Sequence, residues 1–361
     1  MRTGTVTIND LPVGEALLGR VLNAAGEPID GRGALAEAPR RALRWPGGRR
    51  EPAGTPLETG IKVVDLFAPL ARGGIAGIFS GIGVGKMVLL NEMIHNLATR
   101  HHGYSMILGL EDRTYEVNDL MDVLREQGVQ GYATVIFGRR DERAEAYSQV
   151  VLAGLTVAEH FREQGRDVLL FVDQQLAQEI DPLNLYGVVG EGGSITTIVF
   201  GEEDETGIAR LAPHLDNVIR FSVDLAKQQI WPAVDPLASR SMLLERVLVD
   251  DEHLRTARQA AAILQRYAGL KPMPEESRSD LSEEDRRLIA RARRIQRFQS
   301  QPFSVAEPYT AMPGTYVTLA ETIRSFRELV EGRYDDLPEE AFSFVGTIDQ
   351  ALQKAVQQGR T

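Results

Sequence analysis

Residues 80–87 read Ser80-Gly81-Ile82-Gly83-Val84-Gly85-Lys86-Met87. They follow an apolar run and precede a helical pattern, which is the context in which a Gly-rich loop binds phosphate. The glycines let backbone N–H groups converge on phosphate oxygens, the helix N-terminus adds a favourable dipole, and Lys86 would reach the terminal phosphates. The alternative is a Gly-rich turn with a surface lysine. The stretch therefore predicts a phosphate-binding loop at the start of a helix.

The match to the pattern G-x-x-x-x-G-K-[ST] departs at both ends. Ser80 stands where the first glycine is expected, which is tolerable if its φ is negative and strained otherwise. Met87 stands where a Ser or Thr hydroxyl would bind Mg²⁺, and a thioether is a poor ligand for a hard cation. We therefore expect phosphate binding to survive and metal-dependent hydrolysis to be weakened. Water and the nucleotide itself remain alternative ligands for Mg²⁺.

Around this loop, residues 55–250 alternate apolar strand patterns with amphipathic helical patterns. Strands are expected at 73–80, 104–110, 133–138, 167–173, 194–200 and 217–223, and helices at 87–100, 116–128 and 142–165. The alternation predicts an α/β fold with a mostly parallel sheet covered on both faces and ligands at the C-terminal ends of its strands. Asp173 ends one strand, so its carboxylate is either a metal-side ligand or a helix N-cap.

The flanking regions differ in character from this core. Residues 1–54 read as a strand-and-turn lead-in with a basic connector, and residues 251–361 as a charge-rich helical domain. The net charge of −11 argues against a general nucleic-acid binder. The absence of cysteine excludes disulfides and thiolate metal sites, and it fits a reducing compartment. Without an apolar run long enough for a membrane span or a signal peptide, we expect a soluble cytoplasmic protein.

Several longer stretches resemble the beta subunits of F-type ATP synthases, in the same order along the chain. They are TGIKVVDLFAPLARGG (59–74), GYSMILGLEDRTYEVNDL (103–120), AGLTVAEHFREQGRDVLLFVD (153–173), IWPAVDPLASRS (230–241), SDLSEED (279–285), RARRIQRFQSQPFSVAE (291–307) and GRYDDLPEEAFSFVGTIDQA (332–351). The resemblance implies a RecA-like P-loop core and a C-terminal helical domain. It also implies a hexameric ring, in which the chain joins alpha-type subunits around a rotor shaft. Such a ring binds ATP or ADP and couples ATP hydrolysis or synthesis to proton transport. It reaches the inner membrane through partner subunits.

The resemblance also assigns roles to individual residues. Lys86 binds phosphate and Asp173 lies near the metal. The family's catalytic glutamate lies in a GERT stretch, which here reads Glu111-Asp112-Arg113-Thr114. Asp112 therefore takes the catalytic position, Glu111 is a substitute, and Arg113 matches the phosphate-side arginine; a solvated surface triad is the alternative. The carboxylate of Asp112 is one methylene shorter, and a misplacement of that size can cost about 10²-fold in rate.

Three aromatic residues occupy the positions at which the family stacks adenine: Trp231, Phe303 and Tyr309. Stacking contributes roughly 1–3 kcal/mol per base on single-strand binders, and the same physics applies here. Each aromatic residue alone is more often a core residue than a ligand contact. Their joint match favours an adenine pocket.

Other stretches depart from the family. The chain begins about where the N-terminal β-barrel of the family ends, so that barrel is expected to be absent. Only residues 174–192 separate Asp173 from the following strand, and the acidic shaft-contacting loop reads EEDETGIARLAP at 202–213. These changes leave a second hypothesis, a catalytically impaired paralogue that binds nucleotide as a regulatory or structural subunit. A third, an export or RNA-translocating ring ATPase, is opposed by the acidic charge and the SDLSEED stretch.

Overall fold

The structure is a computed structural model of the chain. It describes residues 10–35, 37–45, 52, 54–110, 114–138, 144–180, 185, 187–190, 192–270 and 282–359. The chain forms two compact units that are each assembled from separate stretches. The first unit contains Met1–Ala53, Ala71–Ile78 and Met93–Asp216, and the second contains Gly54–Leu70, Phe79–Glu92 and Asn217–Thr361.

A mostly parallel sheet forms the centre of the first unit. Its strands lie in the order β11 (Ser194–Glu202), β9 (Asp167–Asp173), β7 (Tyr104–Leu110), β8 (Ala133–Gly138) and β2 (Val21–Asn23). All four of these neighbouring pairs are parallel. The short strand β10 (Val188–Val189) adds to β11 in the antiparallel sense. The lead-in at the start of the chain thus contributes β2 to the edge of the sheet.

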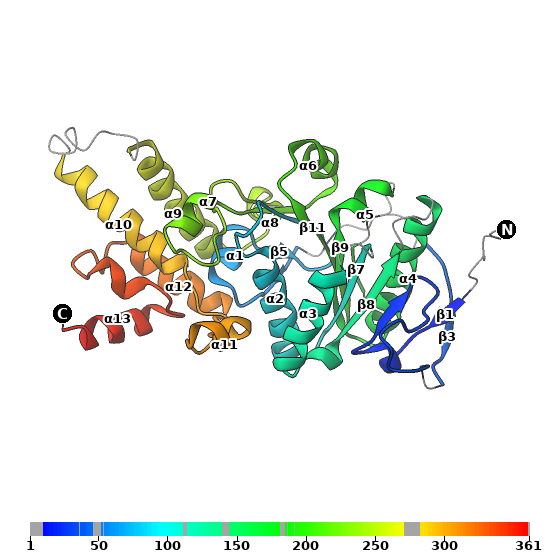
Figure 1. Ribbon diagram of the computed structural model, residues 1–361. Coiled ribbons are helices and arrows are strands. Elements are labelled where there is room, and N and C mark those ends of the chain that lie inside the picture. Colours follow the sequence, from blue (N-terminus) through cyan, green and yellow to red (C-terminus); the bar gives the residue numbers. More distant parts are fainter. Residues whose placement is uncertain are drawn as a thin grey trace. The chain divides into compact units, whose positions relative to one another are not determined.

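Burial explains why these strand sequences are continuous apolar runs. Every residue of β7 and β8 is buried, as is all of β9 after its first residue, so both faces of the sheet are covered. The long helix α4 (Ala144–Glu163) lies against β7, β8 and β9 (Figure 1). The other helices of this unit are α3 (Thr114–Glu126), α5 (Gln174–Glu179) and α6 (Glu205–Leu211), with short 3₁₀ turns at Glu15–Leu17, Gln130–Tyr132 and Ala212–His214.

A smaller sheet and several loops complete the first unit. Strand β1 (Asp10–Pro12) pairs antiparallel with β3 (Arg40–Ala42). Nearby, Arg20 forms a half-enclosed ion pair with Asp30, with 2.7 Å between Arg20 Nε and Asp30 Oδ2. The chain passes from one unit to the other within β5 (Leu70–Ala71) and again within β6 (Ile75–Ser80). The first four residues of β6 belong to the first unit.

The second unit contains several short elements besides the last two residues of β6. These are β4 (Pro56–Leu57), α1 (Lys62–Phe67), β12 (Asn217–Arg220), α7 (Val223–Lys227), β13 (Arg240–Ser241) and α8 (Met242–Glu245). Strand β12 pairs antiparallel with β13, and Phe221 N–H donates to Phe79 O over 3.3 Å. The predicted strand at 217–223 ends early, at Arg220, because the Ser222 hydroxyl accepts from Leu225 N–H and starts α7.

Helices make up the rest of the second unit (Figure 1). They are α9 (Asp251–Leu270), α10 (Glu283–Gln299), α11 (Glu307–Thr310), α12 (Leu319–Val330) and α13 (Ile348–Gln357), with 3₁₀ turns at Ser304–Ala306 and Glu339–Phe342. Helix α9 packs against α10 and α12. Phe298 contacts Phe326 edge-on, with 5.1 Å between the ring centroids, and Phe326 contacts Phe67 in the same way at 5.7 Å. The sequence therefore predicts the fold class correctly, as a mostly parallel α/β core followed by a helical region.

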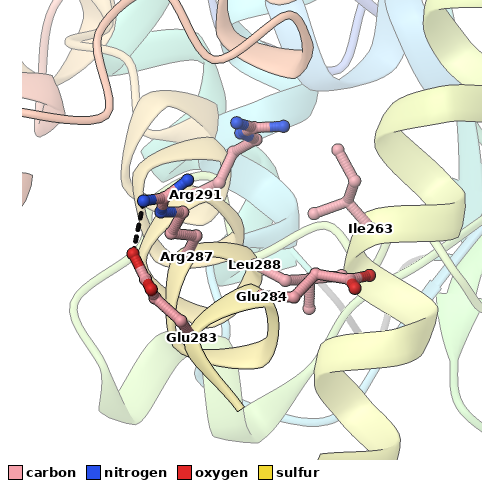
Figure 2. Close-up of a pocket in the computed structure, with 6 residues that line it drawn as sticks. All are labelled: Ile263, Glu283, Glu284, Arg287, Leu288 and Arg291. Atoms are coloured by element: carbon pink, nitrogen blue, oxygen red, sulfur yellow. Dashed lines mark hydrogen bonds and ion pairs between the residues drawn. The ribbon is translucent and has the colours of Figure 1, made fainter.

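The helical region contains a surface pocket of about 410 Å³ (Figure 2). Ile263 of α9 lines one side, and the other lining residues come from α10: Glu283, Glu284, Arg287, Leu288 and Arg291. Charged side chains at this pocket are paired, because Arg287 bonds Glu283 and Arg291 bonds Asp335. The pocket contains none of the site residues that the sequence predicts.

Candidate functional site

The Gly-rich loop joins the end of β6 to the start of α2 (Lys86–Arg100), as the sequence predicts. Gly83 and Gly85 have φ values of +77° and +86°, which glycine adopts without steric cost. Leu89 N–H donates to Gly85 O over 3.1 Å, as the helical ladder begins. The first four N–H groups of a helix have no partner within it. The loop therefore leads directly into a 15-residue helix whose N-terminus favours an anion.

Ser80 does not strain the backbone at the start of the loop. It is fully buried and does not have a positive φ. Its hydroxyl donates to Gly81 O over 2.9 Å. The departure from glycine at this position is therefore compatible with the loop.

The other end of the loop differs more in its chemistry. Lys86 and Met87 form the first turn of α2, and both are half-buried. Val84 is buried, whereas Ile82 at the tip of the loop is 89% exposed. At residue 87 the helix carries a thioether sulfur, and Mg²⁺ prefers oxygen. The side chain at this position does not fit a magnesium ion.

Trp231 is the aromatic residue that the structure brings to the loop. A β-carbon at Gly85 would lie only 3.1 Å from Trp231 Cζ3, so the indole ring lies directly against the backbone of the loop. Trp231 is itself half-buried, and its carbonyl accepts from Gln301 N–H over 2.9 Å. The φ of Gly85 therefore favours glycine, and a β-carbon at this position would press against the ring of Trp231.

Phe303 and Tyr309 have different environments. Phe303 is buried, with 6% of its surface exposed, and it directly precedes the 3₁₀ turn at Ser304–Ala306. Tyr309 lies on α11 and is 77% exposed. The predicted role of these two rings in base stacking stays a prediction.

Glu92 is a residue of this region that the sequence interpretation missed. It lies on α2, six residues after Lys86, and its side chain is fully buried. Its two carboxylate oxygens accept from Ser304 N–H and Val305 N–H, each over 3.1 Å. Burial raises the pKa of Glu92 to about 7, although both backbone bonds favour the ionised form. An acidic residue within the apolar run MVLLNEMI was the available signal.

Asp173 lies in the first unit, at the end of β9. It is 3% exposed, and its carboxylate accepts from Gln175 N–H over 2.8 Å as the N-cap of α5. The carboxyl ends of β9, β7 and β11 lie at one edge of the sheet, since Leu108 pairs with Val172 and Phe200 with Asp173. The capping role that the sequence left open is thus present. The predicted metal role stays a prediction.

The predicted residues Glu111, Asp112 and Arg113 lie outside the described residues. Two other stretches that depart from the resembled family are described in part. Residues 174–192 contribute α5 and β10, and residues 202–213 contribute α6, whose N-cap Asp204 accepts from Thr206 N–H and Gly207 N–H.

A Gly-rich loop between a strand and a helix, within a mostly parallel α/β core followed by a helical region, is consistent with the RecA-like class of fold. Residues 60–179 match the model of the ATP synthase alpha/beta family, nucleotide-binding domain. The matched segment runs from just before α1 to the end of α5 and includes the Gly-rich loop. Over this part of the chain, the match supports the ATP synthase alpha/beta family. Among the described residues, no helix is both long and apolar enough to cross a membrane.

Proposed function

We propose that the chain is a beta-type subunit that binds ATP or ADP through the Gly-rich loop. The observation that carries this proposal is the contact between the loop and Trp231, at which a β-carbon on Gly85 would approach the indole to 3.1 Å. An aromatic face beside a phosphate-binding loop suits a ligand with a planar base and a phosphate chain. Inorganic phosphate alone has no planar group that could stack on that face.

Each part of the loop has a distinct role in this proposal. Backbone N–H groups at the start of α2 bind phosphate oxygens, and the helix dipole favours their negative charge. Lys86 adds a point charge for the terminal phosphates. Trp231 stacks on the base, together with Phe303 and Tyr309. Stacking contributes roughly 1–3 kcal/mol per base on single-strand binders.

Magnesium has a smaller role in this chain than the resemblance implies. Met87 offers sulfur where a hydroxyl oxygen would bind the ion. The Asp173 carboxylate, the other assigned ligand, caps α5. We therefore propose nucleotide binding that depends little on the metal, with Lys86, Glu111, Asp112 and Arg113 supporting weak turnover at most.

The assembly follows from the same resemblance. We propose that the chain joins alpha-type subunits in a ring and touches a rotor shaft through the acidic first turn of α10, Glu283 to Asp285. In this proposal, the chain contacts a membrane only through its partner subunits. The second candidate, a catalytically impaired paralogue, is favoured by the thioether at residue 87.

Calorimetric titration with ATP and ADP, with Mg²⁺ and with a chelator, tests the proposal. The wild-type chain is expected to bind ADP with an affinity that changes less than threefold when Mg²⁺ is removed. Lys86→Ala should weaken binding at least tenfold, which is about 1.4 kcal/mol. Arg258→Ala, which removes an exposed cation from α9, is the control and should bind normally.

Two outcomes would contradict parts of this account. If ADP does not bind, or if Lys86→Ala binds as well as the wild type, the Gly-rich loop is not the nucleotide site. Robust Mg²⁺-dependent ATP hydrolysis would exclude the impaired paralogue and favour an active beta-type subunit.

A further inference from the structure

Glu92 connects the helix that follows the Gly-rich loop to the segment that contains Phe303. We propose that Glu92 is a positioning residue that holds residues 303–305 on α2, and that it thereby makes the site select nucleotides over polyphosphates without a base. This inference rests on the proposed function and adds a residue that the resemblance does not assign. Glu92 touches neither base nor phosphate in the proposed mode, and it acts through the backbone of Ser304 and Val305.

The contact geometry is specific. Glu92 uses both carboxylate oxygens, one for Ser304 N–H and one for Val305 N–H, at 3.1 Å each. These amides open the 3₁₀ turn at Ser304–Ala306, where backbone donors lack local partners. Lys86 and Glu92 lie six residues apart on the same helix, which is about 9 Å along its axis. The phosphate-side lysine and the 303–305 segment are thereby linked through about one and two-thirds turns of α2.

Contacts with other parts of the second unit also fix the position of residues 303–305. A β-carbon at Gly314 would lie 2.3 Å from Ser304 N, so the two backbones are in close contact. Two residues before Phe303, Gln301 donates its N–H to Trp231 O and its side-chain amide to Gly60 O and Thr315 O. Trp231 and Phe303 thus lie on a common hydrogen-bonded framework. Glu92 connects this framework to the helix that the Gly-rich loop begins.

Burial supports a positioning role over simple packing. A buried carboxylate costs free energy that an apolar side chain of similar volume would not, so packing alone does not require Glu92. Its desolvation is large enough to raise its pKa to about 7. The carboxylate supplies two acceptors for the backbone N–H groups of Ser304 and Val305, which an apolar residue cannot do.

Two probes separate the base from the phosphates. ADP would contact both the Gly-rich loop and the aromatic residues, whereas inorganic tripolyphosphate would contact the loop alone. If Glu92 positions the aromatic segment, its loss should weaken ADP binding and leave tripolyphosphate binding unchanged. A residue that merely supports the fold of α2 would affect both probes equally.

Trp231 provides a direct optical signal for this test. The chain has two tryptophans, so Trp45→Phe leaves Trp231 as the only tryptophan that emits. In this parent, the affinities for ADP and tripolyphosphate are measured by calorimetry and the quenching of Trp231 emission by ADP is recorded. Glu92→Gln keeps the shape of the side chain and removes one of its two acceptors. Glu58→Gln is the matched control, because Glu58 accepts from Leu319 N–H and Tyr316 OH, neither of which belongs to the 303–305 segment.

We expect Glu92→Gln to weaken ADP binding at least fivefold, to change tripolyphosphate binding less than twofold, and to reduce the quenching of Trp231. Glu58→Gln should match the parent. Equal weakening of both probes, or unchanged ADP binding, would overturn the inference. If Glu92→Gln does not fold, Glu92→Met fills the same space without acceptors, and ADP selectivity like the parent's would overturn the inference in the same way. A parent that binds neither probe overturns the proposed function, and the inference with it.

Discussion

Lys62 is fully buried, and its charge is matched by specific partners. Its ammonium donates to Phe298 O and Val345 O over 2.6 Å each and to Ser300 O over 3.3 Å, and it lies 3.7 Å from the centroid of the Phe298 ring. Burial lowers the pKa of Lys62 well below its usual value. Three acceptors for three N–H donors nevertheless suit the ammonium form, because a neutral amine would offer only two donors.

Replacing Lys62 should therefore destabilise the fold. Lys62→Met keeps the apolar stem and leaves three carbonyl groups without this donor, so the free energy of unfolding should fall by about 2–4 kcal/mol. Urea denaturation measures this change. Lys354→Met is the matched control, because the half-buried Lys354 bonds one carbonyl, Ser343 O at 2.7 Å, and its loss should cost less. Equal stability of the Lys62→Met and wild-type chains would contradict this view.

Met87 is the residue that accounts for the proposed binding of nucleotide without Mg²⁺. Met87→Thr places a hydroxyl oxygen at the first turn of α2, where an oxygen ligand could bind Mg²⁺. We expect the affinity for ATP with Mg²⁺ to exceed that with a chelator by roughly tenfold in this variant, a gain of about 1.4 kcal/mol. Val88→Thr, which adds a hydroxyl at a 42% exposed neighbour, should gain no dependence on Mg²⁺. If Met87→Thr behaves like Val88→Thr, side chains other than residue 87 limit the metal site.

Helices α1 and α2 each carry a buried carboxyl group, and both should make stability depend on pH. Burial raises the pKa of Asp65 and of Glu92 to about 7. Asp65 accepts from Thr59 N–H, Thr59 OH and Gly60 N–H, and these bonds only partly offset its desolvation. The folded chain therefore binds protons more tightly than the unfolded chain, whose carboxyl groups titrate near pH 4.

The sign of this effect is fixed by proton linkage. Between about pH 4.5 and pH 7 the folded state keeps protons that the unfolded state has lost, so stability falls as the pH rises through this window. Each carboxyl group contributes at most about 1.4 kcal/mol per pH unit. Urea denaturation at pH 5, 6 and 7.5 should show that the advantage of the wild type over Glu92→Gln shrinks as the pH rises. An advantage that grows over this range would contradict the burial of an acid at this position.

The sequence predicts elements well where the signal is local. The expected strands at 104–110, 133–138 and 167–173 coincide with β7, β8 and β9, because fully buried parallel strands are continuous apolar runs. The Gly-rich loop is equally local, since its glycines and the following helix are adjacent in the chain. Glu92 could not be predicted in this way, because its partners Ser304 and Val305 lie more than 200 residues away. The resemblance assigns Trp231 to an adenine pocket, but no local pattern in the sequence predicts that its ring lies against Gly85.

At the scale of the whole molecule, the two compact units interleave along the chain. The Gly-rich loop and the first turns of α2 belong to the unit that contains the helices of residues 217–361, whereas β7, β9 and Asp173 belong to the other. The division at residues 54 and 250 that the sequence suggests stays a prediction. The proposed site for nucleotide phosphates and base thus lies within one unit, and the predicted metal residue lies in the other.

The central claim is that the second unit binds nucleotide through the Gly-rich loop and Trp231, and hydrogen–deuterium exchange with and without ADP tests it most directly. Bound ADP should slow exchange in peptides that cover residues 80–92, 229–235 and 300–310, because these segments contain the loop and the proposed aromatic contacts. Peptides from α13 should exchange equally in both samples. Slower exchange confined to the first unit, or none at residues 80–92, would contradict the account.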